Sequence, residues 1–203
     1  MSAITFWYEF ASTYSYPAAF RVEAQAAAAG LTVNWRPFLL GPIFAALGWS
    51  TSPFNLQPAK GRYMWRDLER TCARLGLPFR RPEPFPQNSV LAARVAYALP
   101  DDGARAHFSR CAYRAEFGAG LTISETSVMA DILTEAGFAA DAILARAATP
   151  EIRQALRQAT EAAQALGLFG APMLTTADNE VFWGNDRIDE AVAWASSAAR
   201  VDK

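Results

Sequence analysis

The sequence has few of the side chains that carry sulfur, metal or imidazole chemistry. It contains two cysteines and one histidine. Cys72 and Cys111 are far apart on separate predicted helices, an arrangement that is typical of neither a disulfide framework nor a metal site. Thiol–disulfide exchange needs a nucleophilic sulfur, so the sequence argues against a disulfide oxidoreductase. We expect no metal, and we expect His107 to have a structural role on a helix away from the motifs described below.

Neither sign of charge predominates, and long apolar runs are missing. Lys and Arg together number 19 and Asp and Glu 20, for a net charge of −1, which gives no basic surface for nucleic acid or an anionic membrane. No apolar stretch reaches the roughly 18 residues of a membrane span. The first residues lack the basic and apolar regions of a signal peptide. We therefore expect a cytoplasmic protein that binds neither nucleic acid nor membrane.

The most informative stretch that is present covers residues 6–16, Phe-Trp-Tyr-Glu-Phe-Ala-Ser-Thr-Tyr-Ser-Tyr. A β-type run of aromatic residues leads into small hydroxyl residues just before an alanine-rich helix. Unpaired backbone N–H groups collect at such a helix start and stabilise an anion or a thiolate. Ser12 and Ser15 have the spacing of the Cys-x-x-Cys motif of thioredoxin-like folds. The stretch therefore predicts a thiolate site whose thiol comes from another molecule.

Strand patterns occur only near the two ends of the chain. We predict strands at 3–10 and 31–38 joined by a helix at 16–29, and a hairpin of strands at 173–176 and 180–183 followed by a helix at 187–200. The first three elements form a β-α-β unit, which is expected to be parallel. Helical patterns fill the middle, at 59–75, 88–99, 102–117, 125–136, 140–147 and 150–166, with expected N-caps at Ser124 and Thr149. The simplest assembly is an α/β fold in which a helical domain, 43–164, is inserted into a sheet domain formed by 1–42 and 165–203.

Two features near the C-terminal strands suggest further parts of a site. Pro172 stands directly before a strand, where a proline is unusual. A cis Ala171–Pro172 bond would let neighbouring backbone groups pair with an extended peptide; we predict cis, although trans is the commoner state of an X–Pro bond. Asn185 and Asp186 could either cap the last helix or bind the ammonium group of a ligand, and the residues alone leave both roles open.

Taken in order, these segments resemble the kappa-class glutathione transferases and the 2-hydroxychromene-2-carboxylate isomerases, a thioredoxin-like family with a helical insertion. The resemblance extends over nearly the whole chain. Each motif alone is weak, and their shared order carries the assignment. The motifs are Glu9-Phe-Ala-Ser12-Thr-Tyr14-Ser15, Arg36-Pro-Phe-Leu-Leu-Gly41-Pro-Ile-Phe44, Pro58-Ala-Lys60-Gly-Arg-Tyr63-Met-Trp-Arg-Asp67-Leu, Phe85-Pro-Gln-Asn88, Gly167-Leu-Phe-Gly-Ala-Pro172 and Phe182-Trp-Gly-Asn-Asp186-Arg.

The resemblance implies glutathione as cofactor and a homodimer. It implies that the Ser12 hydroxyl donates to the glutathione sulfur and holds it as thiolate, in a pocket that Thr13 and Tyr14 also line. Most relatives have proline at the position of Thr13, so the local turn is expected to be less rigid here.

The resemblance also assigns roles to the C-terminal residues. Met173, after the expected cis-Pro172, would pair through its backbone with the cysteinyl part of glutathione. Asn185 and Asp186 match the family's pair that holds the γ-glutamyl end.

Lys60 matches a family lysine in the helical insertion that faces the cleft, where it could bind a substrate carboxylate or glutathione; an ordinary solvated lysine is the alternative. Relatives often have asparagine nine residues before this lysine, where this chain has Thr51. Asn55 lies nearby at a different offset, so the sequence does not decide which of the two takes that role.

The implied activity is the glutathione-dependent isomerisation of 2-hydroxychromene-2-carboxylate or a related unsaturated aromatic acid, by reversible thiolate addition, bond rotation and elimination. A kappa-type transferase that conjugates electrophiles is the alternative, and a redox-silent glutathione-binding module is a third. The aromatic residues of the insertion would suit a flat substrate or belong to the core; they are Phe44, Trp49, Phe54, Tyr63, Trp65 and Phe85.

Overall fold

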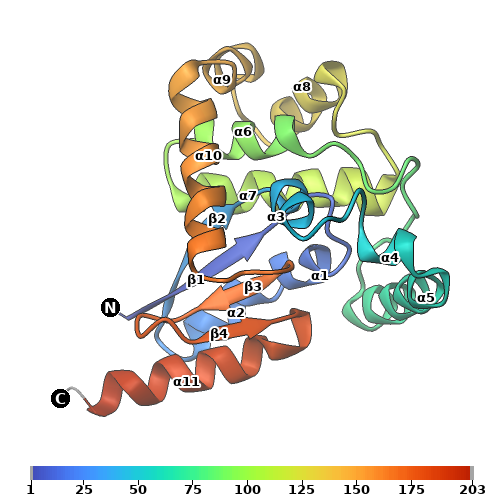
Figure 1. Cartoon of the computed structure of the whole chain (residues 1–203). Helices are drawn as coiled ribbons and strands as arrows, with labels where there is room; N and C mark the ends of the chain where they lie inside the picture. The colour runs from blue at the N-terminus through green and yellow to red at the C-terminus, as the bar shows by residue number, and fades with distance from the viewer. Residues whose placement is uncertain (1, 202–203) are drawn as a thin grey trace.

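A mixed β-sheet lies at the centre of the computed structural model, which describes residues 2–201. Its strands are β1 (Ala3–Tyr8), β2 (Thr32–Pro37), β3 (Met173–Thr175) and β4 (Val181–Trp183), in the spatial order β2-β1-β3-β4 (Figure 1). β1 and β2 are parallel, whereas β3 is antiparallel to both β1 and β4. The predicted α/β sheet of two halves from opposite ends of the chain is confirmed. The expected segment 165–203 extends two residues beyond the described part.

The connection between β1 and β2 differs from the single helix expected at 16–29. It is made of two short helices, α1 (Ser15–Ala19) and α2 (Val22–Ala28), with Phe20 and Arg21 between them. At this break the Arg21 side chain reaches the far end of the chain, where it donates to the backbone oxygen of Asn185 at 2.8 Å. The break thus allows an early residue to contact the last turn before the C-terminal helix.

Helices fill the described chain between β2 and β3, as the sequence predicts. They are α3 (Leu40–Ala46), α4 (Pro53–Leu56), α5 (Pro58–Leu75), α6 (Val90–Ala98), α7 (Asp102–Tyr113) with a π-helical extension η1 (Arg114–Gly118), α8 (Thr126–Glu135), α9 (Ala140–Ala147) and α10 (Pro150–Ala165). After β4 come the 3₁₀ turn η2 (Asn185–Arg187) and α11 (Ile188–Val201). No helix in the part of the chain that the structure describes is long and apolar enough to cross a membrane.

The two predicted N-caps have different outcomes. Thr149 caps α10 by accepting from the backbone N–H of Ile152, and a proline follows at the first helical position. Ser124 does not cap α8, because this helix begins one residue later than expected and Glu125 occupies the cap position without a side-chain bond. The prediction for Ser124 is therefore wrong.

The core covers both faces of the sheet. Alternation along β1 places Phe6 and Tyr8 on one face, where both rings meet Trp35 at centroid distances of 5.0 and 5.3 Å. Trp7 points to the opposite face, against Phe38. The Phe6 cluster continues into α7 and its neighbours. The helical middle and the sheet therefore share the larger apolar cluster, and a second cluster surrounds Trp7 on the opposite face.

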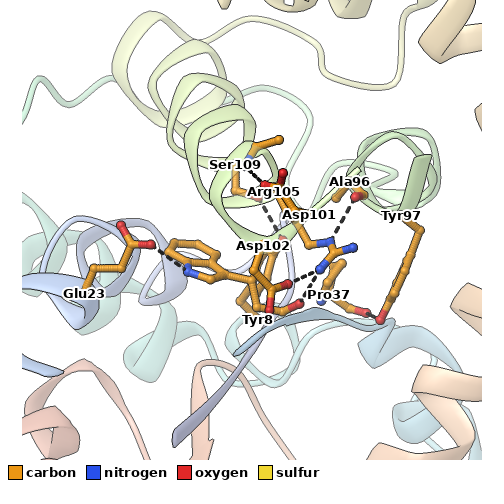
Figure 2. A network of polar contacts seen from close by, with 11 residues as sticks. Tyr8, Glu23, Pro37, Ala96, Tyr97, Asp101, Asp102, Arg105 and Ser109 are labelled. Atoms are coloured by element: carbon orange, nitrogen blue, oxygen red, sulfur yellow. Dashed lines mark hydrogen bonds and ion pairs between the residues drawn. The ribbon is translucent and has the colours of Figure 1, made fainter. Parts of the chain in front are cut away.

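Buried polar contacts attach the helices α6 and α7 to the strands (Figure 2). Arg105 on α7 donates to the backbone oxygens of Ala96 at 3.0 Å and Trp35 at 3.3 Å, and also pairs with Asp102. Tyr97 on α6 donates to the oxygen of Pro37 at the end of β2. The helical insertion is thus tied to β2, the edge strand that pairs with β1, and the N-terminal half of the site follows β1.

We propose that residues 43–164 are a helical segment inserted along the chain into a sheet domain formed by 1–42 and 165–203. This division describes the order of the chain, and the two parts pack against each other. All strands of the described part lie in the first set. Residue 42 falls within α3, so a boundary placed there divides a helix.

Candidate functional site

The Ser12 hydroxyl lies where the two ends of the chain meet. After β1 the chain turns sharply, with the backbone N–H of Ser12 donating to the oxygen of Glu9 at 3.0 Å. The Ser12 Oγ then donates to the backbone oxygen of Ala171 at 2.8 Å, a contact between residues 159 positions apart. The Ala171–Pro172 bond is cis, as the sequence predicts. The motif that contains Ser12 and the motif that contains Pro172 are therefore adjacent in the structure.

Ser12 faces a cavity of about 390 Å³, which we call the aromatic cavity. Thr13, Tyr14 and Lys60 line it as well. Aromatic side chains from three parts of the chain make up much of its wall: Phe44, Trp49, Phe54, Phe85, Phe169 and Trp183. Of the aromatic residues named from the sequence, Trp65 is not among the lining residues. It packs edge-on against Phe85, with 4.6 Å between the ring centroids. Tyr63 lines a different cavity.

That second cavity, of about 550 Å³, has a polar wall and is called the polar cavity below. Its lining includes Asn185 and Asp186 together with charged residues of α5 and η2, namely Asp67, Arg74 and Arg187. Three residues line both cavities: Tyr14, Ala171 and Trp183. The two cavities thus adjoin at these three residues, which we call the ridge, with Ser12 lining one cavity and Asn185 the other.

Asn185 is held in place by Arg21. The Nη1 atom of Arg21 donates to both the backbone oxygen and the Oδ1 of Asn185, at 2.8 and 3.0 Å. With its Oδ1 occupied, the Asn185 amide group has its N–H donors left for a ligand acceptor. Asn185 is buried, which limits its freedom to turn away from this orientation.

Asp186 follows in a turn that requires glycine. Gly184 has a φ of 118°, and a Cβ at this residue would lie 2.5 Å from the Asp186 Oδ1. The Asp186 carboxylate is largely exposed and lies 3.5 Å from Arg187. Asp186 can therefore offer a negative charge to a cationic group in the polar cavity.

Tyr14 connects the ridge to α5. Its hydroxyl donates to the Asp67 carboxylate at 3.0 Å, and Arg70 pairs with the same carboxylate at 3.0 Å. Burial, followed by the nearby Asp67 charge, raises the pKa of Tyr14. Tyr14 consequently stays a neutral hydroxyl with its proton directed toward α5.

Lys60 lines the aromatic cavity from α5, with its Nζ 5.7 Å from the centroid of the Phe54 ring. Gly61 makes this approach possible, because a Cβ there would lie 2.4 Å from the backbone oxygen of Phe54. Thr51 also lines the cavity. Asn55 is not among the lining residues and donates to the Thr51 Oγ1 and the Phe85 oxygen, both at 3.2 Å. Thr51 thus faces the cavity, and Asn55 supports it.

The structure does not bring Met173 to either cavity. Met173 is fully buried and lies in β3 between Trp7 of β1 and Trp183 of β4. Neighbouring strands flank it on both sides, so its backbone belongs to the sheet. Ala171, on the other side of Pro172, lines both cavities and presents its carbonyl to Ser12.

Glu9 is a cavity residue to which the sequence reasoning gave no role. It is 5% exposed, lines the aromatic cavity, and accepts a hydrogen bond from the Ser89 Oγ, which lines the cavity too. Burial raises the pKa of Glu9 to about 7, and hydrogen bonds from Ser89 and the backbone of Ala11 act in the opposite direction. Its place three residues before Ser12 was a signal that could have identified it.

The side chains set aside on the sequence lie away from the cavities. Cys72 is buried, and burial raises the pKa of its thiol to about 11. His107 is exposed on α7 with its Nε2 at 3.2 Å from the oxygen of Ala136. None of these residues, nor Cys111, lines either cavity.

The family of the chain follows from its sequence match to a family model. A family model described as a DSBA-like thioredoxin domain matches residues 3–193, and the chain belongs to this family. Solved structures agree on the fold: a 2-hydroxychromene-2-carboxylate isomerase superposes with a TM-score of 0.87 at 23% identity, covering 98% of this chain and 97% of that one.

Proteins related in sequence include isomerases and kappa-class glutathione transferases. The 2-hydroxychromene-2-carboxylate isomerase of Sphingobium xenophagum is 31% identical over 187 residues, which is 92% of this chain and 94% of that protein. Glutathione S-transferase kappa 2 of Caenorhabditis elegans is 22% identical over 92% of this chain and 88% of its own length. The resemblance inferred from the order of the motifs is confirmed.

Proposed function

We propose that the protein is a glutathione-dependent isomerase of 2-hydroxychromene-2-carboxylate or a related unsaturated aromatic acid. The observation that carries the proposal is the junction of the two cavities at Tyr14, Ala171 and Trp183. One compartment is aromatic and contains the Ser12 hydroxyl, and the other is polar and contains Asn185 and Asp186. The names of the relatives supply the substrate class.

The residues present fit glutathione, an extended tripeptide with a central thiol and charged ends. Asp186 offers a carboxylate to its ammonium group, and the Asn185 amide has N–H donors directed away from Arg21 for its α-carboxylate. The Ala171 oxygen on the ridge can accept from a peptide N–H, the kind of backbone pairing that holds extended peptides. We assign this pairing to Ala171 in place of Met173, since Ala171 lines both cavities.

Ser12 has one proton to donate, and in this structure the proton points to the Ala171 oxygen. When a ligand N–H occupies that oxygen, the Ser12 hydroxyl is released to turn toward the sulfur. A hydrogen bond from a hydroxyl to an anion stabilises the ionised form and lowers the pKa of the thiol. When bound, glutathione supplies a thiolate that adds reversibly to a conjugated alkene, so that the former double bond rotates before the thiolate leaves.

Lys60 and the aromatic walls determine what the aromatic cavity accepts. Flat faces from Phe54, Phe85 and Trp183 suit an aromatic ring, and the Lys60 ammonium suits a carboxylate. We assign the substrate carboxylate to Lys60 and its ring to the aromatic walls. Thiolate stabilisation by Ser12 would equally serve a kappa-type transferase, which is the second candidate because kappa transferases are among the relatives.

The test is conversion of 2-hydroxychromene-2-carboxylate to its open-chain benzylidenepyruvate isomer, followed by absorbance with and without glutathione. We expect turnover that requires glutathione and leaves its concentration unchanged. Consumption of glutathione with an electrophile, and no isomerisation, would favour the transferase. The proposal includes a cytoplasmic homodimer, and light scattering of the purified protein tests the dimer.

A further inference from the structure

We propose that Glu9 is a proton-transfer group of the aromatic cavity that opens the hemiketal ring of the substrate before the double bond rotates. This inference rests on the proposed function for the identity of the substrate. It assigns a chemical step that the thiolate site does not perform.

Glu9 and Ser12 are three residues apart and line the same cavity. Glu9 directly follows β1 and begins the Ser12 turn, and its backbone oxygen accepts from the Ser12 N–H. Its carboxyl group is fixed by the Ser89 hydroxyl from the connection before α6, and both residues line the cavity. A substrate in contact with the Ser12 side of the cavity is therefore also within reach of a buried carboxyl group.

Burial favours the uncharged form of Glu9. Glu116 in η1 is fully buried, neither of its carboxyl oxygens has a hydrogen-bond partner, and burial raises its pKa well above the ordinary range. Tyr113 from α7 donates its hydroxyl to the Glu9 backbone oxygen, and Lys60 provides the positive charge of the cavity. Burial also raises the pKa of Glu9 to about 7. Both forms of the carboxyl group are then accessible near neutral pH, as acid–base catalysis requires.

The chemistry of the substrate calls for such a group. In 2-hydroxychromene-2-carboxylate, C2 carries a hydroxyl group and is bonded to the ring oxygen, so C2 is a hemiketal carbon. The double bond cannot rotate while the ring is closed. Ring opening breaks the bond between C2 and the ring oxygen and must therefore come first.

Glu9 alone can donate and accept the two protons that move during ring opening. The electron pair of the broken C2–O bond goes to the ring oxygen, which takes the proton of the Glu9 carboxylic acid and becomes a phenol. The C2 hydroxyl gives its proton to the Glu9 carboxylate, and its O–H electron pair forms the ketone. Glu9 is returned to its acid form, and the open-chain keto acid has the same atoms as the ring.

Two substrate analogues separate this step from the thiolate step. The hemiketal 2-hydroxychroman-2-carboxylate has a ring to open but no alkene, and its exchange with the open chain can be followed by NMR without glutathione. The cis isomer of benzylidenepyruvate without the ring hydroxyl has an alkene but cannot cyclise, and its isomerisation is followed by absorbance with glutathione.

We expect Glu9→Gln to slow protein-catalysed opening of the hemiketal by about 100-fold or more, within the range of general acid–base catalysis, and to leave isomerisation of the non-cyclising alkene within about threefold of wild type. Ser12→Ala should show the reverse pattern. Glu116→Gln is the matched control, because it changes a buried carboxyl group that does not line the cavity, and it should leave both rates near wild type.

The pH profile gives a readout that a structural role would not move. Hemiketal opening by wild type should fall as pH rises through about 7 because the acid form is consumed. Ser89→Ala removes a donor that stabilises the ionised carboxylate, so the fall should move to higher pH.

Wild-type hemiketal opening by Glu9→Gln, or an unmoved profile in Ser89→Ala, would overturn the inference. Equal losses on both analogues would also overturn it, because they would indicate a general defect of the cavity. Failure of wild type to isomerise the non-cyclising alkene would instead contradict the proposed function and leave the hemiketal result to be judged by itself.

Discussion

At the residue scale, the Ser12 hydroxyl combines two contacts that cannot be made at once. It donates to the Ala171 oxygen at 2.8 Å, and the proposed function requires the same proton on a sulfur. A hydrogen bond to a charged group contributes roughly 1.5–3 kcal/mol, which corresponds to about one to two pKa units. Ser12→Ala should therefore raise the thiol pKa of bound glutathione by one to two units. Ultraviolet absorbance of the thiolate as a function of pH measures this shift.

Ser15→Ala is the matched control for this prediction. Ser15 occupies the position of the second cysteine in the Cys-x-x-Cys spacing that begins at Ser12. It is nevertheless fully buried and lines neither cavity. Its substitution should leave the thiol pKa unchanged. An unchanged pKa in Ser12→Ala as well would remove Ser12 from the thiolate site.

In the proposed function, Arg21 acts on glutathione through Asn185. Arg21→Ala removes both hydrogen bonds that orient the Asn185 amide, so the amide loses its fixed direction. We expect the Kd for glutathione to rise about tenfold, equivalent to 1.4 kcal/mol, with kcat at saturating glutathione nearly unchanged. Isothermal calorimetry and saturation kinetics separate the two effects.

The control for Arg21 is Arg66→Ala, which removes an exposed arginine that pairs with Glu69 on the surface of α5. It should bind glutathione as wild type does. A similar loss in both variants would indicate a nonspecific effect of positive charge.

At the scale of elements, the aromatic cavity depends on how closely α4 approaches α5. An alanine Cβ at Gly61 would lie 2.4 Å from the backbone oxygen of Phe54, and backbone cannot move aside as cheaply as a flexible side chain. Overpacking of this kind costs about 1–3 kcal/mol. Gly61→Ala should lower the free energy of unfolding by that amount and raise KM for the aromatic substrate. Urea denaturation and steady-state kinetics measure the two effects.

Gly41→Ala serves as the stability control, because a Cβ at Gly41 in α3 meets nothing within 4 Å. It should be neutral or slightly stabilising in a helix. If Gly61→Ala unfolds at the same urea concentration as wild type, the close approach of α4 and α5 does not limit stability.

The elements also show what sequence patterns can and cannot predict. The strands and the long helix at 59–75 were recovered because their periodicity and end signals extend over many residues. α3 and α4 have seven and four residues, too few for a helical period to be recognised. The interruption at Phe20 and Arg21 was missed because the alanine-rich sequence favours a continuous helix, whereas the contact of Arg21 with Asn185 is made 164 positions away.

In the site, too, local motifs predict some residues, and contacts between distant parts of the chain determine the others. The motifs indicate six residues that each line at least one of the two cavities: Ser12, Thr13, Tyr14, Lys60, Asn185 and Asp186. The choice between Ala171 and Met173 depends on which strands flank β3, and this pairing is a property of the assembled sheet. Arg21 and Asp67 act through contacts with residues distant in sequence, so no local pattern could identify them.

At the scale of the whole molecule, two buried carboxyl groups make stability depend on pH. Burial raises the pKa of Glu9 from about 4.5 to about 7, so the folded state binds a proton that the unfolded state releases. The stabilisation is fully present below pH 4.5 and is lost as pH rises through 7. The difference corresponds to about 3 kcal/mol. Glu116 acts in the same direction, since burial raises its pKa as well.

We therefore expect the free energy of unfolding to decrease between pH 5 and pH 8, and Glu9→Gln to show a smaller decrease than wild type. Urea titrations at several pH values measure both profiles. Parallel profiles for wild type and Glu9→Gln would show that Glu9 titrates alike in the folded and unfolded states.

The contact between Ser12 and Ala171 has a consequence for the choice of thiol. A thiol that brings no backbone N–H leaves the Ala171 oxygen without a protein or peptide partner whenever Ser12 turns to the sulfur, and a lost hydrogen bond of this kind costs about 0.5–1.5 kcal/mol. Cysteine-containing peptides repay this cost, and small thiols such as 2-mercaptoethanol do not. The protein should therefore discriminate among thiols by their amide group, and replacing glutathione with excess 2-mercaptoethanol should restore little of the turnover.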